Sequence, residues 1–185
     1  IAQCLVGSEM CIRDRFYSLS TILIMIVPLL TMRTFSEERK DGTEQLLLTA
    51  PRSVTSIVLG KFFAALIVLL IAVLLTFTYY IILMFLGNPN IKTSLVTVFG
   101  FILLGAALIS FGMFASSITE NQVIAAIISI AFYVITWIGT PYLSQSLEPL
   151  GLMNMFNRFG NGQIACTEVV AFLSYTVLFL SLIHI

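Results

Sequence analysis

The chain has 185 residues, of which 59% are hydrophobic and 10% are charged, and its nine basic and nine acidic side chains cancel. A soluble domain carries about 25% charged residues, so this chain has too few polar side chains to cover a globule in water. The composition therefore predicts an all-α, polytopic helical membrane protein. It also argues against binding to nucleic acid, because a chain without net charge has no broad attraction for phosphates.

The cysteines and the histidine do not form a recognisable metal-binding, disulfide or catalytic pattern. Cys4, Cys11 and Cys166 follow neither a metal-binding nor a disulfide spacing, and His184 is the single histidine of the chain. We therefore expect no metal, no cofactor and no catalytic cluster, and we do not expect an enzyme.

The first 15 residues differ from those that follow, because four charged side chains interrupt any apolar run there. The string GSEMCIRDR resembles a translated sequencing adapter, and LSLIHI at the other end resembles another. We expect residues 1–15 to be a non-native or disordered tail and residues 16–185 to form a single transmembrane domain. The alternative is that the tail is a short cytoplasmic or interfacial segment.

Five apolar segments are long enough to be membrane spans. They cover residues 16–32, 62–86, 95–115, 123–139 and 169–185. A helix needs about 17–25 residues to cross ~30 Å of hydrocarbon, and each segment reaches the lower limit of that length. Small residues recur four positions apart in and just after the third segment, in the pairs Ala106/Ser110 and Gly112/Ser116. Such pairs let helix backbones approach closely, so we expect these four residues to mediate helix packing.

The distribution of basic residues predicts the orientation of the spans. The polar segment 33–61 contains five Lys and Arg residues, whereas the loops at 87–94 and 140–168 contain one each. Cytoplasmic loops carry the excess of Lys and Arg, so segment 33–61 is expected in the cytoplasm and the other two loops outside. The turn at 117–122 has no basic residue and is assigned to the inside by counting spans.

Segment 33–61 contains signals for three short helices. Ser36 is expected to cap the first, with Glu37 and Glu38 in its first turn, where acidic side chains suit the helix dipole. Gly42 is expected to end that helix. A third helix is expected to begin after Ser53 and to continue into the second span. Its first apolar residues, expected along the membrane face, are Val54, Ile57, Val58 and Phe62.

The middle helix is predicted at residues 44–50, with Thr43 as its cap and Pro51 as its end. Its leucines form an apolar surface within a charged segment. That surface has three ways to be covered, and the pattern does not choose between them. It can lie on lipid, pack against the spans of its own chain, or fit a groove on a soluble partner.

The run IVPLLTMRTFSEERKDGTEQLLLTAPRSVTSIVLGKF resembles the permease subunits of ABC-2 type transporters. The turn SSITENQ and the stretch NRFGNGQIACTEVVAFLSY resemble that family too, so the resemblance covers about residues 16–182. Each short piece is a weak signal, and their order and spacing together are specific. The matching residues of the long run are Pro28, Met32, Arg33, Glu37, Glu38, Arg39, Gly42, Thr43, Glu44, Leu46, Leu47, Pro51, Gly60 and Lys61.

The resemblance implies that segment 33–61 is a cytoplasmic coupling loop that docks on a separate ABC ATPase subunit. It also implies an exporter that contains a second permease copy, in the lipid bilayer of a prokaryotic inner (plasma) membrane. A permease of this family usually has six spans, which implies one more span before Phe16. The docking residues that the resemblance implies are Glu37, Glu38, Arg39, Gly42, Thr43, Glu44, Leu46 and Leu47.

ATP hydrolysis is expected on the partner because the chain has no Walker motif. Gly60 and Lys61 lack the preceding glycine pattern, and Phe62 stands where Ser or Thr should follow. The pattern favours a Lys61 side chain that extends to the membrane interface over one that makes a specific contact.

Two other functions stay open from the sequence, namely an ion-coupled secondary transporter and a structural assembly protein with no ATPase partner. A secondary transporter usually places an acid or a base inside the membrane, and here every Asp and Glu lies in a loop or at a span end. Arg158 and Glu168 lie at the outer ends. There the sequence favours ordinary solvation over a contact with cargo or with each other.

Overall fold

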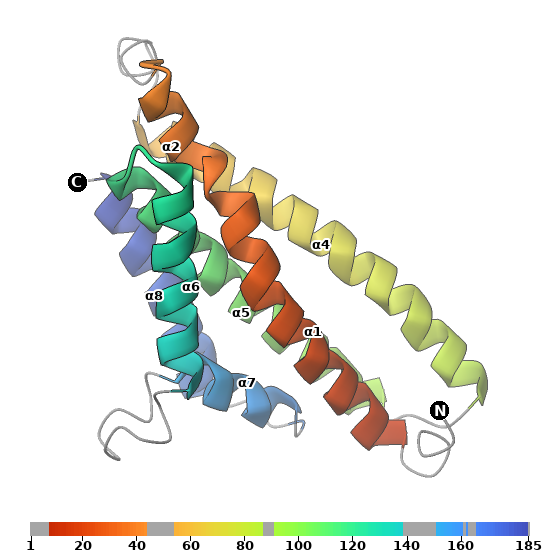
Figure 1. The fold of residues 1–185 in the computed structure, drawn as a ribbon. Coiled ribbons are helices and arrows are strands. Elements are labelled where there is room, and N and C mark those ends of the chain that lie inside the picture. Colours follow the sequence, from red (N-terminus) through yellow and green to blue (C-terminus); the bar gives the residue numbers. More distant parts are fainter. Residues whose placement is uncertain are drawn as a thin grey trace.

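The computed structural model describes residues 8–43, 54–86, 91–138, 151–160, 162 and 166–184. Every regular element in these ranges is a helix, which confirms the predicted all-α class (Figure 1). The helices are α1 (Ser8–Thr31), α2 (Arg33–Lys40), α4 (Val54–Leu86), α5 (Ile91–Ile118), α6 (Gln122–Ile138), α7 (Leu152–Gly160) and α8 (Cys166–His184).

A helix covers the described part of each of the five predicted apolar segments, except for Met32, which follows the end of α1. Among the described residues, four helical segments are long and apolar enough to cross a membrane: Phe16–Lys40, Val54–Thr76, Lys92–Ile118 and Cys166–Ile183. A shorter apolar helix at Gln122–Trp137 corresponds to the segment predicted at 123–139. The protein is therefore a multi-pass helical membrane protein.

Helix α5 is the centre of the bundle and contacts every other described helix. Its middle is almost fully buried, with Leu104, Ile109 and Met113 each at most 3% exposed. Two glycines allow this close packing. A Cβ added at Gly105 would lie 2.2 Å from Leu69 Cδ1 of α4, and one at Gly112 would lie 2.2 Å from Thr31 Oγ1 of α1. The backbone of α5 thus lies directly against side chains of two neighbouring spans.

The outward faces of the spans are apolar, as a lipid environment requires. Met25 on α1, Leu74 on α4 and Val177 on α8 are 57%, 70% and 64% exposed. A soluble protein rarely exposes contiguous apolar surface on this scale, so these faces fit the hydrocarbon of a bilayer.

Helix α4 begins at Val54 and runs without interruption, and its first turns do not lie where the sequence predicted. The sequence predicted that Val58 and Phe62 lie along the membrane face, and this was wrong, because both are buried within the protein at 4% and 7% exposure. They belong to one helical stripe with Ala65, Leu69 and Val73, which are also buried. Because the helix is continuous, this stripe faces the bundle from Val58 to Val73.

Candidate functional site

Helix α2 follows α1 after the single residue Met32 and lies at one end of the bundle (Figure 1). The sequence predicted a helix capped by Ser36, and this was wrong, because α2 begins at Arg33. Ser36 lies within the helix, is fully buried, and donates its hydroxyl to the carbonyl of Met32. Glu37 and Glu38 therefore lie in the second turn of α2.

The first turn of α2 is capped by a residue of α5. Ser116 Oγ accepts the backbone N–H groups of Phe35 and Ser36, both at 3.1 Å, and donates to the carbonyl of Met32 at 3.0 Å. The first N–H groups of a helix have no partner within the helix, and a side-chain oxygen is the usual way to satisfy them. The sequence identified Ser116 as a small packing residue but did not predict its capping role. A cap 80 residues away leaves no local signal.

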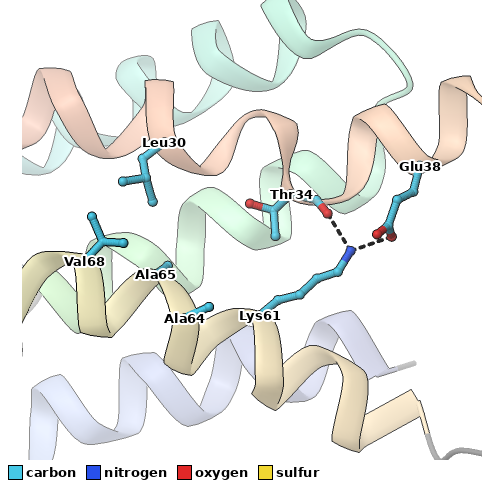
Figure 2. Close-up of a pocket in the computed structure, with 7 residues that line it drawn as sticks. All are labelled: Leu30, Thr34, Glu38, Lys61, Ala64, Ala65 and Val68. Atoms are coloured by element: carbon cyan, nitrogen blue, oxygen red, sulfur yellow. Dashed lines mark hydrogen bonds and ion pairs between the residues drawn. The ribbon is translucent and has the colours of Figure 1, made fainter.

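Lys61 of α4 makes the second connection to α2 (Figure 2). Its ammonium lies 2.5 Å from Glu38 Oε2 and donates to the carbonyl of Thr34 at 2.6 Å. It also lies 4.3 Å from the centre of the Phe35 ring, a cation–π distance. The sequence favoured an extended Lys61 at the membrane interface over a specific contact, and the structure shows the specific contact.

Arg39 makes the third connection, from the last turn of α2 to the end of α5. Its guanidinium donates to the carbonyl of Ser117 at 2.8 Å. The helix then ends as the sequence predicted, because Gly42 has a φ of +69°, a backbone conformation that glycine adopts without strain. Thr43 folds back, and both its N–H and its hydroxyl donate to the carbonyl of Glu38.

A shallow open groove of about 350 Å³ separates α4 from α1 and α2. Thr34, Glu38 and Lys61 form its polar end, as Figure 2 shows. Its other walls are apolar and consist of Leu30, Ala64, Ala65 and Val68. The ion pair thus closes one end of the groove and holds α2 against α4.

The residues implied for docking divide into two groups. Glu37, Arg39, Gly42 and Thr43 are exposed on or after α2, whereas Glu38 is half-buried by its contact with Lys61. The second group, Glu44, Leu46 and Leu47, lies outside the described residues, as does the predicted helix at 44–50. The described part of the site is therefore a short helix with an exposed charged face and three fixed attachments to the spans.

The four residues predicted to pack helices lie on α5. Ala106 is 8% exposed, and Ser110 and Ser116 are fully buried. Gly112 lies against Thr31 of α1 and the hydroxyl of Tyr133 of α6. At the other end of the bundle, Glu168 is buried and pairs with Arg158, although the sequence favoured solvation for both.

Comparison with known proteins identifies the family. The family model described as ABC-2 family transporter protein matches residues 4–184. No curated protein matched the chain, and no solved structure matched it. The match covers nearly the whole chain, so the protein belongs to the ABC-2 family of transporter proteins and is a membrane-spanning permease subunit of an ABC-type transporter.

Proposed function

We propose that this permease works in an exporter and couples ATP hydrolysis on a separate ATPase subunit to movement of its own spans. In this proposal the ATPase docks on α2 and on the segment that follows it. The docking residues are Glu37, Glu38, Arg39, Gly42, Thr43, Glu44, Leu46 and Leu47. The single observation that carries the proposal is the attachment of α2 to the transmembrane bundle at three separate points.

Through those three attachments, movement of α2 would be transmitted to the spans. Ser116 holds the first turn of α2 on α5, Arg39 holds its last turn on the end of α5, and Lys61 holds it on α4. A force applied to the exposed face of α2 would therefore act on two spans at once. Helix α5 would pass that movement on, because it contacts every other described helix. Its close contacts transmit displacement rather than absorb it, because packed interiors have low compressibility.

Helix packing by small residues belongs to the same proposal. Ala106, Ser110, Gly112 and Ser116 would keep α5 close enough to its neighbours to move with them. The apolar outer faces of α1, α4 and α8 leave room for lipid and for a second permease copy. ABC-type transport would use two ATPase subunits that close on ATP, so a pair of permeases would receive the movement symmetrically.

The rival functions make different demands. An ion-coupled transporter needs a titratable group within its transport path, and an assembly protein needs no ATPase at all. The attachments of α2 favour the coupled exporter, because they allow a force applied to α2 from outside the membrane to act on two spans. The choice is therefore decided by whether an ATPase binds this end of the bundle.

The first test is whether a neighbouring gene encodes a P-loop ATPase, and the second is co-purification of the tagged permease with that ATPase. Leu46→Asp combined with Leu47→Asp places charges on the apolar surface proposed for docking, and we expect co-purification to be lost while the permease still enters the membrane. Lys92→Glu is the matched control, because Lys92 is an exposed residue near the start of α5, at the opposite end of that helix from Ser116. Undiminished binding to the double variant would overturn the docking proposal.

A further inference from the structure

At the end of the bundle away from α2, an acidic side chain is buried. Glu168 lies in the first turn of α8, its side chain is 6% exposed, and neither carboxylate oxygen accepts a hydrogen bond from the residues that the structure describes. Its ion-pair partner is Arg158 of α7, whose Nε lies 3.4 Å from Glu168 Oε1. Buried charges are normally paired and fully hydrogen-bonded, whereas this carboxylate has an ion pair whose geometry is not that of a hydrogen bond.

Helix α7 covers the same end of the bundle with its apolar face. Phe159 is fully buried, and a Cβ added at Gly100 of α5 would lie 2.6 Å from Phe159 Cγ. The ring of Phe159 lies 6.1 Å from that of Phe172 of α8. Arg158 directly precedes Phe159 on α7, and its side chain is 61% exposed. Helix α7 is thus held by ring packing on its inner face and by the ion pair to α8.

The geometry points to Arg158 as a positioning residue that keeps α7 seated on α5 and α8 by compensating the buried charge of Glu168. Without the guanidinium, the carboxylate would remain buried and unpaired. Such a charge is strongly destabilising, and contact with water would stabilise it. Because α8 is a membrane span, displacement of the short helix α7 is the simpler way to admit that water.

This arrangement would allow α7 to leave α5 and α8 and to return. Ring packing alone would hold α7 in place, and no charged group would then affect the free energy of displacing it. A poorly compensated carboxylate beneath it lowers the free energy needed to lift the helix, because hydration of Glu168 offsets part of the lost packing. Displacing α7 would uncover Gly100, Phe159 and Phe172 at the end of the bundle opposite α2. A role for that displacement in the transport cycle rests on the exporter function proposed above.

The inference predicts an asymmetry between the two partners. Arg158→Gln leaves a buried, unpaired carboxylate, whereas Glu168→Gln leaves an exposed guanidinium that water solvates. The combination of both substitutions leaves no charge at all. We therefore expect α7 to be loosened by Arg158→Gln alone, with Glu168→Gln and the double variant both close to the unmodified protein. A simple structural pair would instead respond similarly to the loss of either partner.

The measurement is amide hydrogen exchange of the full-length permease in lipid nanodiscs, followed by mass spectrometry. In Arg158→Gln we expect exchange of α7 (Leu152–Gly160) to be about tenfold faster, while α6 (Gln122–Ile138) is unchanged as an internal reference. Arg158→Lys keeps the charge and should preserve slow exchange. If Arg158→Gln fails to fold, recovery of monodisperse protein by adding Glu168→Gln carries the same conclusion.

Two results would overturn the inference: equal loosening by Arg158→Gln and Glu168→Gln, or no loosening by Arg158→Gln. Co-purification with the ATPase should be unchanged in every one of these variants, because the pair lies at the end away from α2. The exporter proposal and the seating of α7 can therefore fail separately. Loss of ATPase binding bears on the first, and the exchange rates of α7 bear on the second.

Discussion

Ser116 of α5 accepts the backbone N–H of Ser36 of α2 at 3.1 Å, across 80 positions of sequence. The same hydroxyl accepts the N–H of Phe35 and donates to the carbonyl of Met32. The N-terminus of α2 is therefore completed by another helix rather than by its own sequence. Any rotation or sliding of α2 relative to α5 has to break these hydrogen bonds, which is why α2 is suited to moving with α5.

Replacing Ser116 by Ala should lower the stability of the permease. Two backbone N–H groups would lose their acceptor, and the loss of a capping side chain costs about 1–2 kcal/mol. For a chain of this size that corresponds to a melting temperature lower by about 2–4 °C for each kcal/mol, measured by thermal unfolding in detergent. Ser117→Ala is the matched control, because that hydroxyl donates only to Phe114 of its own helix. Equal melting temperatures for the two variants would contradict the capping role.

The ion pair between Lys61 and Glu38 should give a measurable coupling energy. A double-mutant cycle with Lys61→Met and Glu38→Gln is expected to give about 0.2–1 kcal/mol, because both side chains are partly exposed at 21% and 32%. The coupling should fall as the salt concentration rises. Lys61→Met should cost more than Glu38→Gln, since Lys61 also donates to Thr34 and lies over the Phe35 ring. Glu37→Gln, at an exposed site of the same helix, is the control, and a cycle with Glu37 in place of Glu38 should give no coupling.

The sequence predicted the spans well because their signal is local. The length of an apolar run indicates whether it can cross a membrane. The apolar runs of the sequence were therefore enough to locate α1, α4, α5, α6 and α8. The site could be predicted only in part. The end of α2 was predicted correctly, because Gly42 is a local signal for a helix end. The start of α2 was misplaced because its capping group is Ser116, which comes from another span.

The charged contacts show the same limit. Lys61 is 23 positions from Glu38, and the pattern around each of them is that of an ordinary interfacial or solvated residue. Only the packing of α4 beside α2 brings them within 2.5 Å. Glu168 and Arg158 were assigned to solvent because they lie in the loop predicted at 140–168. Arg158 is indeed 61% exposed, whereas the packing of α7 buries Glu168. A residue's place along a span indicates its depth in the membrane but not what covers it.

Glycine 112 should be far less tolerant of substitution than Gly60. A Cβ at position 112 would lie 2.2 Å from Thr31 Oγ1 and 3.0 Å from Thr31 Cβ, so Gly112→Ala forces α1 and α5 apart. Overpacking of this kind costs about 1–3 kcal/mol. A Cβ at position 60 meets nothing within 4 Å, and Gly60→Ala should be neutral or stabilise the helix by about 0.5–1 kcal/mol.

Adding Thr31→Ala to Gly112→Ala tests the cause of that loss. Thr31 donates its hydroxyl to Val27 of its own helix, so its truncation by itself removes little. If the clash is with Thr31, the double variant should recover much of the lost stability in denaturant or thermal unfolding. A double variant that is less stable than Gly112→Ala would place the strain elsewhere in the contact.

Tyr133 offers a test of how α6 is held on α5. Its side chain is 1% exposed, and its hydroxyl donates to the carbonyl of Leu108 of α5. Tyr133→Phe removes this hydrogen bond and keeps the ring in place. The loss should therefore be only about 1 kcal/mol. Tyr133→Ala also removes the ring, which lies 5.8 Å from that of Phe111, and a cavity of this kind costs about 3–5 kcal/mol.

Tyr17→Phe, at a 41% exposed ring, serves as the control for the hydroxyl, and its unfolding should match that of the unmodified protein. A Tyr133→Phe variant as unstable as Tyr133→Ala would mean that the hydroxyl, and not the ring, fixes α6 to α5.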